Sequence, residues 1–366
     1  MGDTPLLEVL IPTYGRPESA VSAIRSVLEG SDEKVSVFCH SNGHEPELEE
    51  YCLSQSRVRY GSFVENRGPH HNGYTILSGT VGKFCMILSD EDRLDASQLT
   101  GLLELLETLR SDCNLVSCAV YSDEESRYSY GVESIHKRYV SLAGFTIISA
   151  SPYMSGFVYR SQPLSQLDLR DLLGLTARYP DGAPYNQYSH LDISQRLLIN
   201  GSCCFYHSPL VRMGRTIRTG GNAYSHKSHE LEVEGDGNLD LNPDVYGAYA
   251  RVRQYLYRDL LLSSLQPYFP ATSYVIASAK LCKFFYERLF AVSAVVRLHE
   301  KYDFRSEFLK ALGDAQLEGH ISGSPFSRMF SDSLLQSQDE RATAYALVKS
   351  ITDQPLRGLT KQLYIG

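Results

Sequence analysis

The chain has 366 residues, of which 43% are hydrophobic and 21% are charged. This composition excludes disordered, collagenous and coiled-coil proteins and is ordinary for a globular protein. Forty-three acidic residues against 35 basic ones give a formal net charge of -8, so we expect no nucleic-acid partner. At roughly 150 residues per domain, the length predicts two domains, or one large domain and a smaller one.

The eight cysteines include no C-x-x-C pair, so neither a zinc knuckle nor a disulfide framework is expected. Reduced, mostly buried thiols and a cytoplasmic location are the expectation. The N-terminus has no basic segment before an apolar one, which predicts no signal peptide. The uncharged stretch between Arg138 and Arg160 is interrupted by Gly144, Pro152 and Gly156, which favours buried strands and a turn over a membrane span.

Strand-like and helix-like segments alternate along the first third of the chain. Short apolar or β-branched runs predict strands at 6–11, 35–39, 57–63, 84–88 and 115–121. Helical patterns lie at 17–29, 45–55, 74–80 and 99–109, with a polar loop at 66–72. This alternation predicts an α/β fold with a doubly wound, mostly parallel sheet.

The remainder of the chain divides into the end of the sheet, a loop and helices. Residues 192–199 read as a short helix and 203–206 as the last core strand. Residues 212–242 have almost no periodicity and read as a long functional loop, and amphipathic helices follow at 245–260 and 277–296. We therefore expect an α/β domain over 1–225 and a helical C-terminal extension over 226–366.

The sharpest chemical signal is Asp90-Glu91-Asp92, directly after a buried strand. Open α/β sheets bind ligands at the carboxyl ends of their strands. Carboxylates of Asp90 and Asp92 at such an edge suit a divalent cation, which can bridge to nucleotide phosphates. The alternative is a solvated acidic turn or a helix start capped by Asp95.

A second candidate lies at the end of the first strand, in Pro12-Thr13-Tyr14-Gly15-Arg16. Backbone N–H groups before a helix and a basic side chain can meet a nucleotide there. The segment is not a Walker loop, and it lacks the G-x-G-x-x-G of a dinucleotide site. Loop packing and capping by Tyr14 and Arg16 is the alternative.

Residues 10–17, Leu-Ile-Pro-Thr-Tyr-Gly-Arg-Pro, resemble the opening strand and loop of the inverting family-two glycosyltransferases. Asn66-Arg67-Gly68, Asn72, Gly82-Lys83-Phe84 and residues 88–92 follow in the family's order, and a weaker match runs from 154–160 to about Val211. The chain is most similar to the bacterial O-antigen and capsule group that includes abequosyltransferase-like enzymes.

This resemblance implies a GT-A fold, a nucleotide-sugar donor, and Mg²⁺ or Mn²⁺ on Asp90 and Asp92. It also implies a glycan or lipid-linked acceptor. The residues it places at the donor are Pro12, Thr13, Tyr14, Arg16, Ser41, Asn66, Asp90 and Glu91.

Two positions depart from the family pattern. Members usually show an aspartate after the second strand that reads the nucleobase, whereas this chain has His40-Ser41-Asn42. Where the family commonly has Glu-Asp before a helix, the chain has His190 and then Asp192. Histidine is competent to deprotonate a sugar hydroxyl, so His190 is the candidate base. Asp192 is the alternative base or a helix cap, and Asp181 is a weaker candidate.

The loop after residue 211 carries cations that suit a diphosphate leaving group. Arg212, Arg215 and Arg218 are the candidates for that role. His207, His226 and His229 are candidates for a third metal ligand. The alternative for these three histidines and the three arginines is that their side chains are only solvated.

The resulting expectation is an inverting, metal-assisted transfer of a sugar by single displacement, with residues 154–160 on the acceptor side. A sugar-phosphate nucleotidylyltransferase is a rival, but it needs a glycine-rich basic loop that residues 13–17 do not supply. The other rival is a carbohydrate-binding or scaffold protein on a degenerate transferase fold.

The last expectation concerns the apolar stripe of the C-terminal helices, which includes Phe284 and Phe285. We expect it to be buried against the α/β domain or a second protomer, as in a homo-oligomer. The alternative is a salt-sensitive, peripheral contact with the inner face of a membrane.

Overall fold

The computed structural model describes residues 4–122, 127–129, 139–148, 154–175, 189–214, 258–259 and 261–290. They belong to two compact units, the first holding the described residues up to 214 and the second those from 258 onward. The predicted domain boundary at 225 and most of the predicted loop at 212–242 lie outside the described residues.

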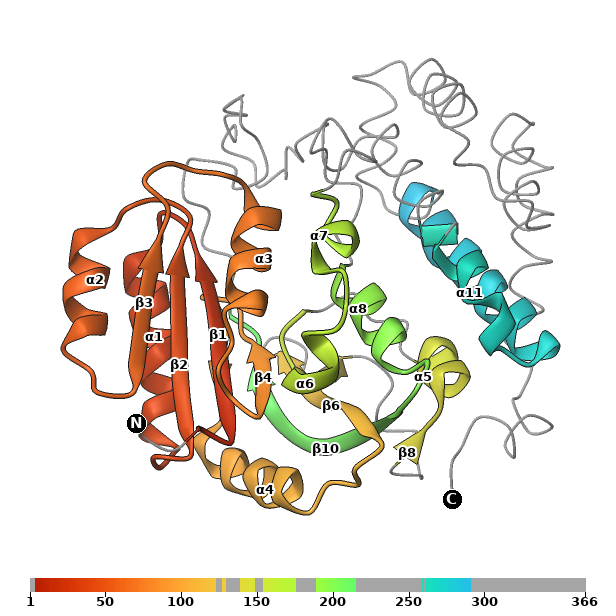
Figure 1. The fold of residues 1–366 in the computed structure, drawn as a ribbon, viewed down its shortest axis with the longest axis horizontal. Helices are drawn as coiled ribbons and strands as arrows, with labels where there is room; N and C mark the ends of the chain where they lie inside the picture. Colours follow the sequence, from red (N-terminus) through yellow and green to blue (C-terminus); the bar gives the residue numbers. More distant parts are fainter. Residues whose placement is uncertain are drawn as a thin grey trace. The chain divides into compact units, whose positions relative to one another are not determined.

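The first unit is built on one sheet of ten described strands (Figure 1). The strands are β1 (Leu7–Thr13), β2 (Val35–Ser41), β3 (Val58–Ser62), β4 (Phe84–Ile87), β5 (Arg93–Leu94), β6 (Cys113–Ser122), β7 (Arg127–Ser129), β8 (Tyr139–Val140), β9 (Phe157–Arg160) and β10 (Ser202–Arg212). The helices are α1 (Pro17–Glu29), α2 (Pro46–Leu53), α3 (Pro69–Ser78), α4 (Ala96–Glu107), α5 (Leu142–Ile148), α6 (Ser161–Leu164), α7 (Leu169–Leu172) and α8 (Ser189–Leu197).

The strand order is β3-β2-β1-β4-β9-β6-β10-β5, with β7 paired to β6 and β8 to β10. Neighbours from β3 to β4 are parallel, as are β6 and β10. Strand β9 runs antiparallel to both β4 and β6. The expectation of a mostly parallel α/β sheet is thus confirmed. The carboxyl ends of β1, β2 and β4 meet at one edge.

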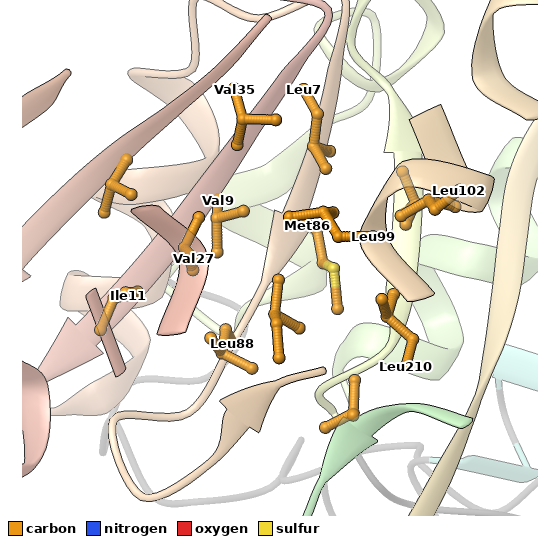
Figure 2. Close-up of a cluster of buried hydrophobic side chains, with 14 of the residues drawn as sticks. Leu7, Val9, Ile11, Val27, Val35, Met86, Leu88, Leu99, Leu102 and Leu210 are labelled. Atoms are coloured by element: carbon orange, nitrogen blue, oxygen red, sulfur yellow. The ribbon is translucent and has the colours of Figure 1, made fainter. Parts of the chain in front are cut away.

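Local sequence explains the first βα unit. Leu7, Val9 and Ile11 alternate along β1, so all three lie on one face of the sheet and join one buried cluster. Helix α1 begins with Pro17 in its first turn. Figure 2 shows Val27 of this helix in the same cluster as the β1 side chains. Burial of these apolar side chains fixes the position of β1 and so of its carboxyl end.

Several predicted boundaries are corrected. Helix α3 begins at Pro69 within the predicted loop, because Gly68 has a positive φ of 85° and proline follows it. Helix α8 begins at Ser189, ahead of the predicted start. Strand β10 continues to Arg212, far beyond the predicted end, because it pairs along its length with β6.

The stretch expected to form only strands and a turn before Arg160 contains a helix, α5, between β8 and β9. A short apolar run does not distinguish a buried helix from a buried strand by its periodicity. The expectation of buried thiols is confirmed for seven cysteines, all of which are free and buried.

The second unit is described from the short 3-10 helix η2 (Gln266–Tyr268) to α11 (Ala271–Phe290). Helix α11 overlaps the predicted apolar stripe: Ala277 is buried and Leu281 is half-buried. The side chains of Phe284 and Phe285 lie outside the description, so burial of the whole stripe stays a prediction. Within the described segments, no helix combines the length and the apolar character that crossing a membrane requires.

Candidate functional site

Asp90 lies in the loop after β4 and is held by the last residue of β1 and by a residue of the loop that follows it. Thr13 Oγ1 donates to its Oδ2 at 2.7 Å. Arg16 Nε donates to Oδ2 at 3.1 Å, and Arg16 Nη2 pairs with Oδ1 at 2.7 Å. Arg16 Nη1 also pairs with the carboxylate of Glu91. The first loop and the acidic loop therefore form one charged cluster, with Asp90 only 1% exposed.

Burial raises the pKa of the Asp90 carboxyl, while the Arg16 guanidinium and the Thr13 hydroxyl act in the opposite direction. The ionised form of a buried carboxylate is expensive without a partner. Arg16 is thus the group that supports the negative charge of Asp90 at this position.

Asp92, fully buried, is held by different donors. Ser155 Oγ donates to Asp92 Oδ2 at 2.6 Å, and the backbone N–H of Gly214 donates to Oδ1 at 3.0 Å. Ser155 Oγ also accepts from the backbone N–H of Ser89 at 2.9 Å. A Cβ on Gly214 would collide with the carbonyl oxygen of Glu91, so this close approach needs glycine.

These contacts do not fit an open site for the predicted divalent metal. Both oxygens of Asp90 are engaged by Arg16, and both oxygens of Asp92 accept hydrogen bonds. Among the described residues, no group of three or more histidine, cysteine or acidic side chains is arranged to hold a metal ion. The sequence predicted that these carboxylates follow a strand, as they do. It did not predict that the guanidinium of Arg16 binds them.

A second polar cluster lies at the end of β2. Ser41 Oγ donates to Glu45 Oε1 at 2.8 Å, and the N–H of Gly15 donates to the same oxygen at 2.9 Å. Asn42 Nδ2 donates to Asn66 Oδ1 at 2.6 Å. Ser41 and Asn66, both predicted at the donor, are thus held beside the first loop by these bonds.

His40 at the end of β2 pairs with Asn72 of α3. Asn72 Nδ2 donates to the carbonyl oxygens of His40 and Thr13, at 3.2 and 3.4 Å. Its Oδ1, 2.6 Å from His40 Nδ1, must therefore accept, which makes Nδ1 the protonated ring nitrogen. Burial lowers the pKa of His40, so a neutral imidazole links the ends of β1 and β2 to α3.

The two candidate bases, His190 and Asp192, lie in α8 and are each 3% exposed. Asp192 lies inside the first turn of α8, so the alternative prediction that it caps the helix is wrong. A carboxylate in the first turn still stabilises the helix through its interaction with the helix dipole. The His190 ring lies 5.8 Å from that of Phe157. Ser155, two residues before Phe157, contacts Asp92. One short segment at the start of β9 therefore contacts both the acidic loop and the candidate base.

The remaining predicted residues are placed less centrally or are not described. Pro12, the last residue but one of β1, is half-buried, and the Tyr14 ring lies over Gly43 in the turn after β2. Arg212 is exposed at the end of β10, where its Nε donates to Tyr121 Oη at 2.7 Å. Asp181, Arg215, Arg218, His226 and His229 lie outside the described residues.

A groove of the described part lies elsewhere. It has a volume of about 1690 Å³ and includes Leu6, Lys83 and Arg160, at the opposite end of β1 and β4 from the acidic loop. Of the segment predicted to line the acceptor side, Arg160 therefore faces this groove, whereas Ser155 reaches Asp92.

Sequence reasoning missed Glu45 and Gly214. It included Ser155 in the segment predicted on the acceptor side and Asn72 in the family's order, but it assigned neither of them a contact. Ser155 and Gly214 follow no strand pattern that would place them at the acidic loop. Glu45 had a weak signal, since it comes shortly after the predicted second strand and its turn.

Comparisons with known proteins agree with this fold. Residues 8–165 match the family model described as Glycosyl transferase family 2. No curated protein matches the sequence of the chain. A crystal structure of S. aureus TarS matches with a TM-score of 0.57 at 11% identity, covering 94% of this chain and 55% of that one. S. aureus TarS 1-349 in complex with UDP-GlcNAc matches with a TM-score of 0.55 at 12% identity, covering 94% and 90%.

The chain thus spans about half of the longer TarS chain. At these identities the structural likeness shows the fold alone. Residues 8–165 are thus similar to the glycosyl transferase family 2 model, and the mixed, mostly parallel sheet has the GT-A-like α/β fold.

Proposed function

We propose that this chain transfers a sugar from a nucleoside-diphosphate sugar to a hydroxyl group of a glycan or a lipid-linked acceptor. One observation carries the proposal: Thr13, Arg16 and Asp90 form a single bonded cluster at the carboxyl ends of parallel strands in a family 2 domain. Ligands of open α/β sheets bind at such an edge.

The donor side comprises the loops after β1, β2 and β4. The related fold of TarS 1-349 was solved with UDP-GlcNAc, which supports a nucleotide sugar as the donor class. Thr13, Tyr14 and Arg16 would border the donor, with Ser41 and Asn66 beside them. Arg212 and Arg218 would face the diphosphate, whose charge grows as the glycosidic bond breaks.

The acceptor side is proposed at α8 and the start of β9. His190 or Asp192 would take the proton of the acceptor hydroxyl, whose oxygen then attacks the anomeric carbon. The nucleoside diphosphate leaves from the opposite side, so the anomeric configuration inverts. The contact between Phe157 and His190 supports this placement, because Ser155 of the same segment reaches Asp92.

The finer predictions receive no support from the comparisons. The comparisons do not favour an abequosyltransferase-like sugar, an O-antigen or capsule product, or a particular base. The transferase domain over 1–225, the helical extension over 226–366, its oligomer contact and a peripheral membrane contact likewise stay predictions.

A carbohydrate-binding protein without transferase activity is the second candidate. The end of β2 favours it, because His40 and Asn42 stand where the family usually has an aspartate and are both engaged in internal hydrogen bonds. Such a protein would bind glycans with no need for a nucleotide.

Thermal-shift measurements against UDP, GDP, CDP and dTDP test the donor site, since a ligand that binds only the folded state raises the melting temperature. We expect one nucleoside diphosphate to raise it. Stabilisation by oligosaccharides and by no nucleotide would favour the second candidate instead.

A further inference from the structure

We infer that Arg16 is the resident cation of the acidic loop at residues 90–92 and that this chain binds a nucleoside diphosphate without a divalent metal ion. The second half of this inference rests on the proposed function. The first half concerns the protein alone and is tested without any nucleotide.

The contacts of Arg16 engage both oxygens of the carboxylate that a metal would need. Its guanidinium meets both oxygens of Asp90, at 3.1 and 2.7 Å, and also pairs with Glu91. The planar, permanently charged guanidinium matches a carboxylate through two parallel hydrogen bonds. With the Arg16 side chain 21% exposed and that of Asp90 1% exposed, water competes little at the Asp90 end of the pair.

The local backbone keeps Arg16 in this position. It is the N-cap residue of α1: its carbonyl oxygen accepts the N–H of Ala20 at 3.0 Å, and Pro17 follows it. Proline fixes φ and restricts the residue before it. The backbone of Arg16 is therefore fixed at the start of α1, from which its side chain reaches Asp90.

A metal ion at Asp92 would face two further obstacles. Ser155 Oγ and the Gly214 N–H already donate to its two oxygens. A divalent cation bridging Asp90 and Asp92 would also be repelled by the guanidinium already bound to Asp90.

The neighbouring cation does not take over the role of Arg16. Arg93 Nη1 donates to the backbone carbonyl oxygens of Asp90 and Asp92, at 3.1 and 2.6 Å. Its Nε donates to Ser22 Oγ at 2.7 Å. Removal of the Arg16 side chain would leave Asp90 and Glu91 without its positive charge, which is the condition under which carboxylates attract a cation.

The first test is a titration of Mn²⁺ into the protein without nucleotide, followed by electron paramagnetic resonance and by the melting temperature. For the wild type we expect no bound Mn²⁺ in the micromolar range and no change in melting temperature. Arg16→Ala should melt several degrees lower, bind Mn²⁺ and regain part of the lost stability. The control Lys34→Ala removes an exposed pair with Glu107 and should behave as the wild type.

Binding of Mn²⁺ by the wild type with micromolar affinity would overturn the inference. So would an Arg16→Ala variant that folds and binds no more Mn²⁺ than the wild type. If Arg16→Ala fails to fold, the wild-type titration still decides, and Arg16→Lys keeps a cation with a different geometry.

The second test measures the affinity for UDP and GDP in EDTA and in Mn²⁺. We expect the dissociation constant of the wild type to agree within about twofold between the two conditions. Binding that requires Mn²⁺ would contradict the inference and leave the proposed function standing. Failure of every nucleotide in both conditions would contradict the proposed function, while the Mn²⁺ titration would still decide the role of Arg16.

Discussion

At the scale of single residues, the two candidate bases, His190 and Asp192, are buried in the same helical turn. The turnover of variants that lack one or the other distinguishes them. If His190 is the base, His190→Ala lowers kcat by about two to four orders of magnitude and leaves donor affinity nearly unchanged, because general-base catalysis acts on the acceptor. His44, which is exposed, supplies the control variant His44→Ala.

The same measurement on Asp192→Ala completes the comparison. A large loss of kcat in Asp192→Ala with little loss in His190→Ala would exchange the two roles.

A second residue-scale prediction concerns His70 in the first turn of α3. Burial lowers the pKa of its imidazole from the ordinary 6.5 to about 4. Between these values the unfolded chain binds a proton that the folded chain does not, so this group makes the free energy of unfolding fall as the pH decreases. Its contribution is complete above pH 6.5 and is lost progressively down to about 4.

Urea denaturation at pH 7 and pH 5 measures this effect. The variant His70→Gln should lose less of its own unfolding free energy between the two pH values than the wild type does. Equal losses in both proteins would show that His70 does not titrate in this way.

At the scale of elements, the start of β9 depends on Gly156, whose φ is +104°. A Cβ there would lie 3.0 Å from Val120 Cγ2 and 3.3 Å from the Cys118 carbonyl oxygen. Gly156→Ala should therefore lower the free energy of unfolding by about 1–3 kcal/mol. It should also weaken nucleotide binding, because the preceding residue, Ser155, bonds to Asp92.

Gly174 provides the matched control, with a φ of +72° and no atom within 4 Å of an added Cβ. Gly174→Ala should cost about 1 kcal/mol of backbone strain and leave nucleotide binding unchanged. Equal nucleotide affinity in Gly156→Ala and Gly174→Ala would show that the start of β9 does not act on the acidic loop.

Local pattern predicted the parallel part of the sheet and the presence of buried strands within 138–160, but it did not predict the antiparallel pairing of the inserted strands. Strands β1 to β4 were predictable because each is an apolar run between turn residues or helices. Strand β5 has two residues, and β9 owes its place to antiparallel pairing with β4 and β6, which no local signal encodes. Buried Glu8 in β1 was equally unforeseen, since its partners, Arg59 and Thr80, come from distant segments.

The candidate site divides in the same way. Thr13, Arg16 and Asp90 were predictable because each follows a strand that the sequence reveals. The bonds of Asp92 to Ser155 and Gly214 were not, because they span 63 and 122 residues of the chain. Whether a metal or an arginine neutralises the acidic loop depends on side-chain geometry, which motif spacing does not contain.

At the scale of the whole molecule, the proposed sugar transfer rests on the match of residues 8–165 to the family 2 model, on the shared strand edge and on the bonded cluster. Transfer of a sugar consumes a nucleotide sugar and yields a nucleoside diphosphate, so product release reports the chemistry directly. Even without the natural acceptor, water can slowly accept the sugar from a bound donor.

The most direct measurement is mass spectrometry of UDP-, GDP-, CDP- and dTDP-sugars incubated with the purified chain and with Asp90→Ala. The account predicts that the wild type slowly releases the nucleoside diphosphate from one class of donor and that Asp90→Ala releases at least about tenfold less. A wild type that binds nucleotide sugars yet releases no diphosphate with any donor or glycan acceptor, or release that persists unchanged in Asp90→Ala, would contradict it.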